Sequence, residues 1–116
     1  NPTPFGVTGL ETTLPLLFAA IAQNMLTTEK LIQMCAINPR RIFHLPEQED
    51  TFVLVHFSET FTIQGSKLFT KNKWTPFEGM QGRGVIKKVA IRGKAVYEEG
   101  NFVSKPQGKI IRPVNL

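Results

Sequence analysis

The side chains that could do chemistry in this chain are few, and the two histidines come first because an imidazole can bind a metal or transfer a proton near neutral pH. His44 and His56 are the only histidines, and neither has a second potential ligand two or four positions away. The HxH, HExxH and CxxC spacings typical of zinc sites are absent from the sequence. We therefore interpret both as structural histidines and assign no metal ligand to this segment.

Nucleophiles give an equally weak signal. The one cysteine, Cys35, lies in the apolar run of residues 32–37, a context that predicts a small buried core residue rather than a catalytic thiol. Ser58 and Ser66 lie outside any nucleophile-elbow pattern, so a Ser/His/Asp triad is not indicated. The sequence therefore assigns no catalytic residue to this segment.

The carboxylates divide into two kinds. Residues 47–50 and 98–99 form acidic turns that we expect at the surface. Glu11 and Glu78 differ because each lies in a motif flanked by glycine or proline. We expect Glu78 to fix a loop by accepting backbone N–H bonds, which contributes about 1.5–3 kcal/mol for a charged acceptor. For Glu11, stabilisation of a helix start and support of a site are both open.

The best candidate for contact with a ligand is the opening loop, residues 1–10, which is rich in proline and glycine. Gly6 lets the backbone approach a ligand closely. The backbone N–H and C=O groups of Phe5 and Gly6 could then pair with an amide or imide edge. A plain glycine turn before a helix is the alternative.

Helices must position this loop. A helix is predicted after Thr12 or Thr13, because five apolar residues share one helical face: Leu14, Leu17, Phe18, Ile21 and Met25. A second helix is predicted over residues 28–37, capped by Thr27. The pair Asn38-Pro39 is expected to end it and to start a third, short helix, with Asn38 as its cap.

Strands follow the helices. Residues 51–57 are apolar on both faces, as in a strand covered on two sides. A short second strand is expected at residues 61–63, a third at 84–92, and a hairpin through Gly93-Lys94. Residues 102–103 add a last rung. This order, helices and then strands, by itself indicates an α+β arrangement.

Composition excludes several classes of function. The net charge of +5 over 116 residues is scattered, with no basic arm, so nucleic-acid binding is not expected. The longest apolar run is too short to span a bilayer, and no signal peptide is recognisable. A single cysteine fits an intracellular, cytoplasmic protein. The start without Met fits a fragment or a processed chain.

Four motifs in order resemble the C-terminal third of dihydroorotase, and within that family the domain of animal multifunctional pyrimidine-synthesis proteins. Residues 5–16 resemble its GLET-x-LPL segment, and residues 38–51, 73–79 and 91–97 resemble later parts of it. The resemblance implies an α/β fold, part of a (β/α)₈ amidohydrolase barrel with an accessory β-sandwich.

The resemblance also implies a division of the chain. Residues 1–46 would be the loop after barrel strand 8 and the terminal barrel helices, residues 47–103 the C-terminal strands of the sandwich, and residues 104–116 an extended tail. The motif match carries over one site role, backbone contact of Phe5 and Gly6 with the pyrimidine ring.

The implied activity is the reversible cyclisation of N-carbamoyl-L-aspartate to dihydroorotate with two zinc ions. The family's metal ligands would all precede Asn1, so this segment alone should be inactive. The implied partners are the substrate, the remainder of the barrel, a second copy in a homodimer, and aspartate transcarbamoylase.

Two alternatives remain open. The parent domain could be an inactive dihydroorotase-like domain that serves as a structural partner of aspartate transcarbamoylase, or a related cyclic amidase of the hydantoinase type.

Overall fold

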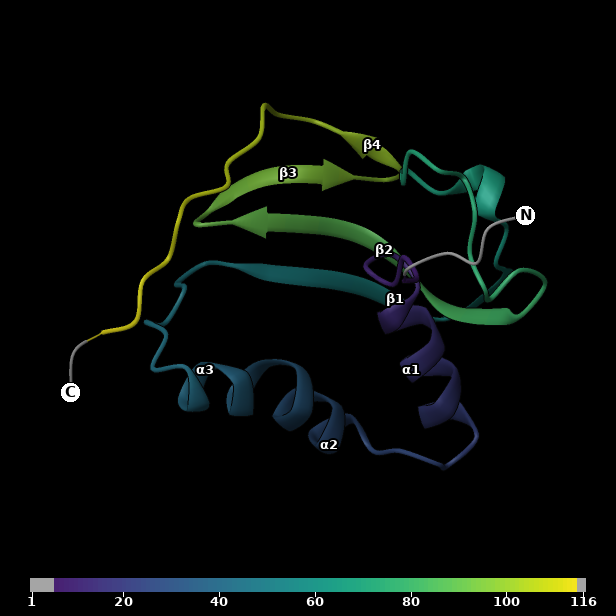
Figure 1. Ribbon diagram of the computed structural model, residues 1–116, viewed down its shortest axis with the longest axis horizontal. Coiled ribbons are helices and arrows are strands. Elements are labelled where there is room, and N and C mark those ends of the chain that lie inside the picture. Colours follow the sequence, from purple (N-terminus) through teal and green to yellow (C-terminus); the bar gives the residue numbers. More distant parts are fainter. Residues whose placement is uncertain (1–5, 115–116) are drawn as a thin grey trace. The chain divides into compact units, whose positions relative to one another are not determined.

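The computed structural model describes residues 6–114, in which helices precede strands along the chain (Figure 1). The helices are α1 (Thr13–Ala22), α2 (Thr28–Ile32), a π-helical turn (Gln33–Ile37) and α3 (Asn38–Ile42). The strands are β1 (Phe52–Thr62), β2 (Gln81–Ile91), β3 (Lys94–Glu98) and β4 (Asn101–Phe102), with a 3₁₀ turn at Gly65–Lys67. The predicted order of elements is confirmed.

The chain divides into two compact units. The first combines Asn1–Met25 with Phe57–Val85, and the second combines Leu26–His56 with Ile86–Leu116. Strands β1 and β2 each contribute to both units, within one sheet of order β1-β2-β3-β4. The candidate loop belongs to the first unit, and both histidines belong to the second.

The helical path of residues 28–42 differs from expectation at Asn38. Thr27 caps α2 as predicted, its hydroxyl oxygen accepting the N–H of Lys30 at 3.2 Å. A short helix, α3, begins at Asn38 as predicted, with Pro39 in its first turn. Asn38 itself, however, has helical backbone angles (φ −65°, ψ −46°), so the prediction that it caps this helix is wrong. Pro39 has no N–H and its ring crowds the carbonyl four residues earlier. The wider π turn just before it lets the helix continue through the proline.

The sheet is simpler than predicted at its start. β1 is one continuous strand of 11 residues where two shorter strands were expected. β2 and β3 are antiparallel, and the pair Ile91↔Lys94 places the two-residue turn at Arg92-Gly93, one position before the predicted one. Both turn residues have positive φ (48° and 76°), as a type I′ hairpin requires.

The first unit has a small core around Ile63, which is 2% exposed. The ring of Phe18 on α1 meets Phe57 on β1 edge-on, with centroids 5.6 Å apart. Gly82 on β2 lies under the Phe61 ring, and a Cβ there would come within 2.9 Å of it. The Phe18 contact packs the middle of α1 against β1 within the first unit.

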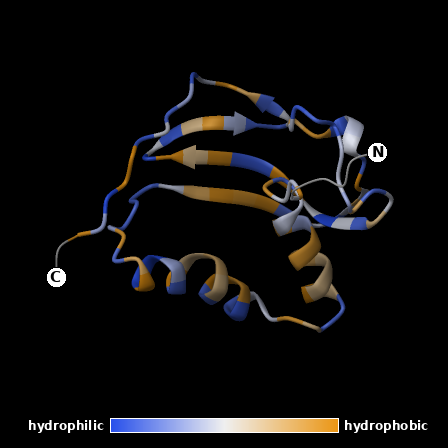
Figure 2. Cartoon of the chain, viewed as in Figure 1, coloured by the Kyte–Doolittle hydropathy of each residue, from blue (hydrophilic) through white to orange (hydrophobic). Residues whose placement is uncertain are grey.

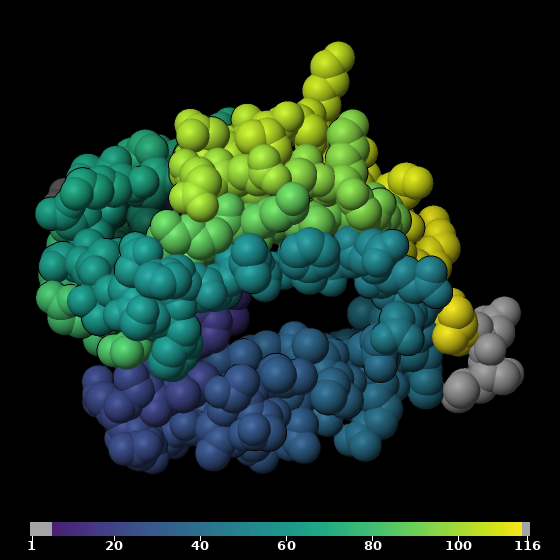
Figure 3. All heavy atoms as spheres, turned by 180° about the vertical axis from the view of Figure 1, so that it is seen from behind, coloured from purple at the N-terminus to yellow at the C-terminus, as the bar shows by residue number. Residues whose placement is uncertain are grey.

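The second unit leaves much apolar surface open. Figure 2 shows β1 as apolar over much of its length, yet Phe52 is 49% and Leu54 55% exposed. The expected cover on both faces of this strand is therefore not provided by residues 6–114. Figure 3 shows the second unit hollowed between the segment of α2 and α3 and strand β1.

Cys35 is exposed on the π turn, so the prediction of a buried thiol is wrong for the described part of the chain. Its apolar neighbours Met34 and Ile37 are also about half exposed (48% and 44%). The apolar run was identified correctly, but no described segment packs over it. Among residues 6–114, no helix is long and apolar enough to cross a bilayer.

Candidate functional site

The candidate site is the loop before α1, which the structure describes from Gly6 onward; Phe5 lies outside the described residues. Gly6 is exposed with φ of 148°, a backbone conformation that side-chain-bearing residues rarely adopt. A Cβ built on it meets nothing within 4 Å, so the space beside this backbone is open. Gly6 can therefore offer its main chain to a ligand without obstruction from the described residues.

The base of the loop is held by the carbonyl of Gly9. This oxygen accepts the N–H groups of Thr12 and Thr13 at 3.2 and 3.0 Å, and the Thr13 hydroxyl at 2.7 Å. Thr12 is buried at 2% exposure, whereas the side chain of Leu10 is 99% exposed. The loop is thus tied to the start of α1 by polar contacts, with no apolar packing at Leu10.

Glu11 forms the main long-range contact of this loop. Its Oε2 accepts the N–H of Phe69 at 2.9 Å, and its Oε1 accepts the N–H of Thr70 at 2.9 Å and the Thr70 hydroxyl at 2.7 Å. The carboxylate therefore accepts three hydrogen bonds from two successive residues, an arrangement that we call the Glu11 fork. The helix-start alternative for Glu11 is wrong: the side chain reaches a segment 58 positions away in sequence.

Partial burial of Glu11 disfavours its charged form, but other contacts outweigh this cost. The Thr70 hydroxyl, the N–H groups of Phe69 and Thr70, and the positive charge of Lys73 all favour the carboxylate. Together they hold the pKa of Glu11 below its ordinary value of 4.5. The fork is therefore fully charged at neutral pH.

The segment that Glu11 reaches, the connection between β1 and β2, is itself fixed. The Glu78 carboxylate accepts the N–H of Gly65 at 2.7 Å, which confirms that Glu78 holds a loop through the backbone. The Thr8 hydroxyl donates to the carbonyl of Trp74 at 3.1 Å. Thr8 and Glu11 thus join the candidate loop to this connection at two points.

The sequence resembles several curated proteins over most of its length, although no family model matches it. It is 43% identical to the multifunctional protein CAD of Squalus acanthias over 91% of this chain and 5% of that protein. It is 34% identical to the dihydroorotase of Pyrococcus furiosus over 91% of this chain and 27% of that one. The chain is homologous to dihydroorotases. The resemblance found in its motifs is confirmed.

This dihydroorotase homologue spans only a small part of its relatives, about a quarter of the archaeal enzyme. An allantoinase of Desulfitobacterium hafniense is also similar, at 32% identity over 93% of this chain and 26% of its own length. The segment is therefore related to more than one cyclic amide hydrolase.

Solved structures support the predicted fold class. An inactive dihydroorotase-like domain of the Chaetomium thermophilum CAD-like multifunctional protein matches with a TM-score of 0.74, at 27% identity over 87% of this chain and 28% of that chain. A D-hydantoinase matches in fold with a TM-score of 0.82, at 23% identity over 91% of this chain and 25% of that one. Such neighbours are barrel-type amidohydrolases, which confirms that the dihydroorotase homologue has part of this fold.

Both histidines belong to the second unit, whereas the candidate loop belongs to the first. His44 is exposed with φ of 51°, and its carbonyl accepts the N–H of Val114 at 2.8 Å, which ties down the C-terminal tail. His56 is exposed on β1. No group of three or more His, Cys, Asp or Glu side chains between residues 6 and 114 could hold a metal ion. The described residues therefore do not fit a zinc centre.

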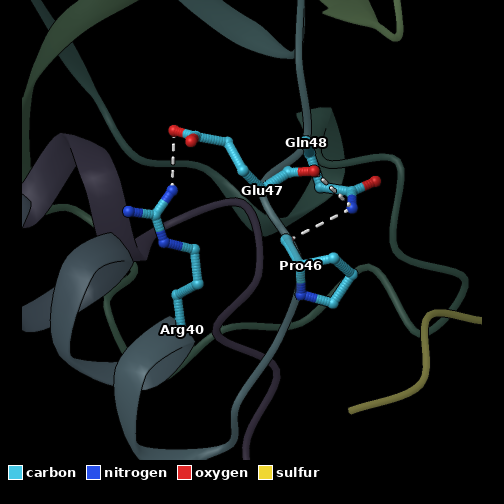
Figure 4. A network of polar contacts seen from close by, with 4 residues as sticks. All are labelled: Arg40, Pro46, Glu47 and Gln48. Atoms are coloured by element: carbon cyan, nitrogen blue, oxygen red, sulfur yellow. Dashed lines mark hydrogen bonds and ion pairs between the residues drawn. The ribbon is translucent and has the colours of Figure 1, made fainter. Parts of the chain in front are cut away.

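Glu47, in the acidic turn at residues 47–50, has a structural partner. Arg40 Nη1 lies 2.8 Å from Glu47 Oε1, and Glu47 is 74% exposed (Figure 4). Beside this pair is a hollow of about 420 Å³ lined by Arg40 of α3 and by residues of the π-helical turn, of the 45–51 connection and of the tail. The ion pair is solvated and contributes little to stability.

The partners of Glu11 could not be found from the sequence. Phe69 and Thr70 carry no motif, and two of their three donors are backbone N–H groups, which every non-proline residue has. Only the glycines around Glu11 marked its position as constrained.

Proposed function

We propose that this chain is the C-terminal segment of a zinc-dependent dihydroorotase, which reversibly cyclises N-carbamoyl-L-aspartate to dihydroorotate. The observation that carries this proposal is 34% identity to an archaeal dihydroorotase over 91% of the chain. The 43% identity to a CAD protein favours a multifunctional parent protein. Within that parent, the segment supplies the substrate-side loop and part of the scaffold.

In this proposal, the backbone groups of Phe5 and Gly6 pair with the amide edge of the pyrimidine ring. The open space beside Gly6 supports this role. Two hydrogen bonds of this kind orient a planar ring without any charged side chain in the loop. The loop therefore contributes binding and orientation, not proton transfer.

The two zinc ions belong to the parent protein's other residues. Bound zinc would supply Lewis-acid polarisation of the amide carbonyl and an activated hydroxide. Because residues 6–114 contain no cluster that fits such a centre, this segment by itself should be inactive.

The remaining parts of the proposal concern organisation. Residues 1–46 would belong to the barrel, residues 47–103 to the accessory sandwich, and residues 104–116 to an extended tail. The partners would be the rest of the barrel, a second copy in a homodimer and aspartate transcarbamoylase, in the cytoplasm.

The test is an assay of the parent protein purified with its full sequence. We expect dihydroorotate hydrolysis that a chelator abolishes and added zinc restores. As a matched pair, Gly6→Val should raise the KM for dihydroorotate, whereas Gly108→Val should not, because a Cβ at Gly108 also meets open space but lies in the tail. A parent protein without dihydroorotate turnover would contradict the proposal.

A second candidate is favoured by one observation, the fold match to an inactive dihydroorotase-like domain. The parent domain would then be a structural partner of aspartate transcarbamoylase. Absent turnover together with co-purification of that enzyme would select this candidate. The allantoinase similarity keeps a third open, a hydantoinase-type cyclic amidase. Faster turnover of hydantoins than of dihydroorotate would select it.

A further inference from the structure

The loop that carries Gly6 has few contacts of its own. Leu10 is 99% exposed and Val7 is 61% exposed, so apolar packing does not fix the loop within the described chain. What fixes it is polar: the Gly9 carbonyl at its base, the Thr8 hydroxyl on Trp74, and the Glu11 carboxylate on Phe69 and Thr70. Of these, Glu11 makes the most bonds to the distant connection.

The Glu11 fork has a demanding geometry. Three donors from two successive residues converge on two carboxylate oxygens at 2.7–2.9 Å. A carboxylate is an acceptor only, so it satisfies all three donors at once, whereas an amide of the same shape turns its NH₂ group toward one of them. Charge-assisted bonds are also shorter and stronger than neutral ones. Replacement of Glu11 by glutamine therefore keeps only part of the fork.

We propose that Glu11 is a positioning residue for a cyclic amide substrate: by clamping the β1–β2 connection at Phe69 and Thr70, it sets where the backbone of Gly6 meets the substrate's amide edge. This inference rests on the proposed function, because it takes the Gly6 loop to contact the substrate. It assigns to Glu11 no contact with the reacting atoms.

The effect on catalysis follows from what the loop does. Two backbone groups that hold a planar ring act on the bound substrate and on the transition state alike. Their displacement weakens both equally, which raises KM and leaves kcat nearly unchanged. A general loss of structure would instead lower the amount of active enzyme and hence the apparent kcat.

The experiment uses the full parent enzyme with Glu11→Ala and Glu11→Gln, and Glu78→Ala as the matched control. Glu78 is also a carboxylate that accepts a backbone N–H in the same unit, at Gly65 within the same connection. This hydrogen bond lies wholly within the connection and does not reach the candidate loop. KM and kcat for dihydroorotate are measured together with the melting temperature of each variant.

We expect Glu11→Ala to raise KM about tenfold, with kcat within about threefold of the wild type. The KM of Glu11→Gln should lie between those of the wild type and of Glu11→Ala. Glu78→Ala should lower the melting temperature and leave KM unchanged. If Glu11→Ala and Glu78→Ala change KM equally, or if Glu11→Ala lowers only kcat, the positioning role is wrong while the proposed function stands. If the wild-type parent itself does not turn over dihydroorotate, the proposed function fails, and the positioning role with it.

Discussion

Two glutamates of the first unit illustrate how a carboxylate can replace apolar packing in a loop. Glu11 and Glu78 both accept backbone N–H groups of the connection between β1 and β2. Unpaired N–H groups in such a partly buried loop would be costly, and a charged acceptor satisfies them strongly. Because Glu11 accepts two of them and a hydroxyl, its protonation should have a structural consequence.

The lowered pKa of Glu11 predicts an acid-dependent contact. In the unfolded chain this carboxyl titrates near its ordinary value of 4.5, and in the folded chain below it. The charged form therefore contributes stability that is fully present above about pH 4.5 and is lost as pH falls through the folded pKa. The positive charge of Lys73 adds to this effect.

The measurement is hydrogen exchange of the amides of Phe69 and Thr70 in the parent protein, compared with Glu11→Gln. The wild type should be better protected at pH 7, and the difference should shrink below about pH 4.5. Thr70→Val removes the hydroxyl bond only and should show a smaller difference. A difference between wild type and Glu11→Gln that persists unchanged to pH 3 would contradict this account.

At the scale of elements, each of the two hairpin turns places a residue other than glycine, Arg92 or Glu99, in the left-handed backbone region. The turn between β3 and β4 places Glu99 at φ of 45° and Gly100 at 88°, joined by the pair Glu98↔Asn101. A residue other than glycine, asparagine or aspartate is disfavoured in this left-handed conformation. The Glu99 carboxylate, which is exposed, lies 3.4 Å from the Lys87 ammonium, and this ion pair offsets little of that cost.

Glu99→Asn should therefore stabilise the protein by about 0.5–1 kcal/mol, because Asn-Gly is the preferred type I′ pair. Glu99→Ala should not, since alanine removes the ion pair and keeps the strain. Thermal unfolding of the parent protein with each substitution gives the comparison. Equal melting temperatures for the two variants would show that the left-handed backbone of residue 99 is not strained.

The sequence predicted these elements where local signals were strong. The cap at Thr27, the strand of residues 84–92 and the hairpin glycines were visible as residue types at fixed positions. The continuation of the helix through Pro39 was not, because it depends on a π turn that no residue type announces. The single long β1 was not predicted either, since its pairing with β2 is set by tertiary structure and not by propensity.

The candidate site was predictable in part for the same reason. The glycines and prolines marked the loop, and the motif resemblance predicted a backbone contact with a pyrimidine ring. The clamp on Phe69 and Thr70 was invisible because it joins residues 58 and 59 positions apart through backbone donors. The role of Glu78 could be predicted because its Gly-flanked position indicated a loop, and its hydrogen bond to the N–H of Gly65 confirms that role.

At the scale of the whole molecule, the exposed apolar side chains fit a chain that is one part of a larger fold. Phe52, Val53 and Leu54 on β1 are 44–55% exposed, although they form one apolar run. These side chains alternate between the two faces of the strand, so both faces expose apolar surface of the kind that another protein segment normally covers. The chain covers only 27% of its dihydroorotase relative. In the proposed parent protein, other residues would be available for this role.

If this strand is covered in the parent protein, Leu54 should behave there as a core residue. Leu54→Ala should then cost about 2–4 kcal/mol of unfolding free energy, the range for a buried leucine. The control is Ile110→Ala, in the extended tail, where the side chain is 85% exposed, so the change should stay within about 0.5 kcal/mol. Denaturant unfolding of the two variants shows whether β1 is covered or exposed in the parent protein. If both substitutions lower the unfolding free energy equally little, β1 faces solvent there, and its apolar surface is free for another partner.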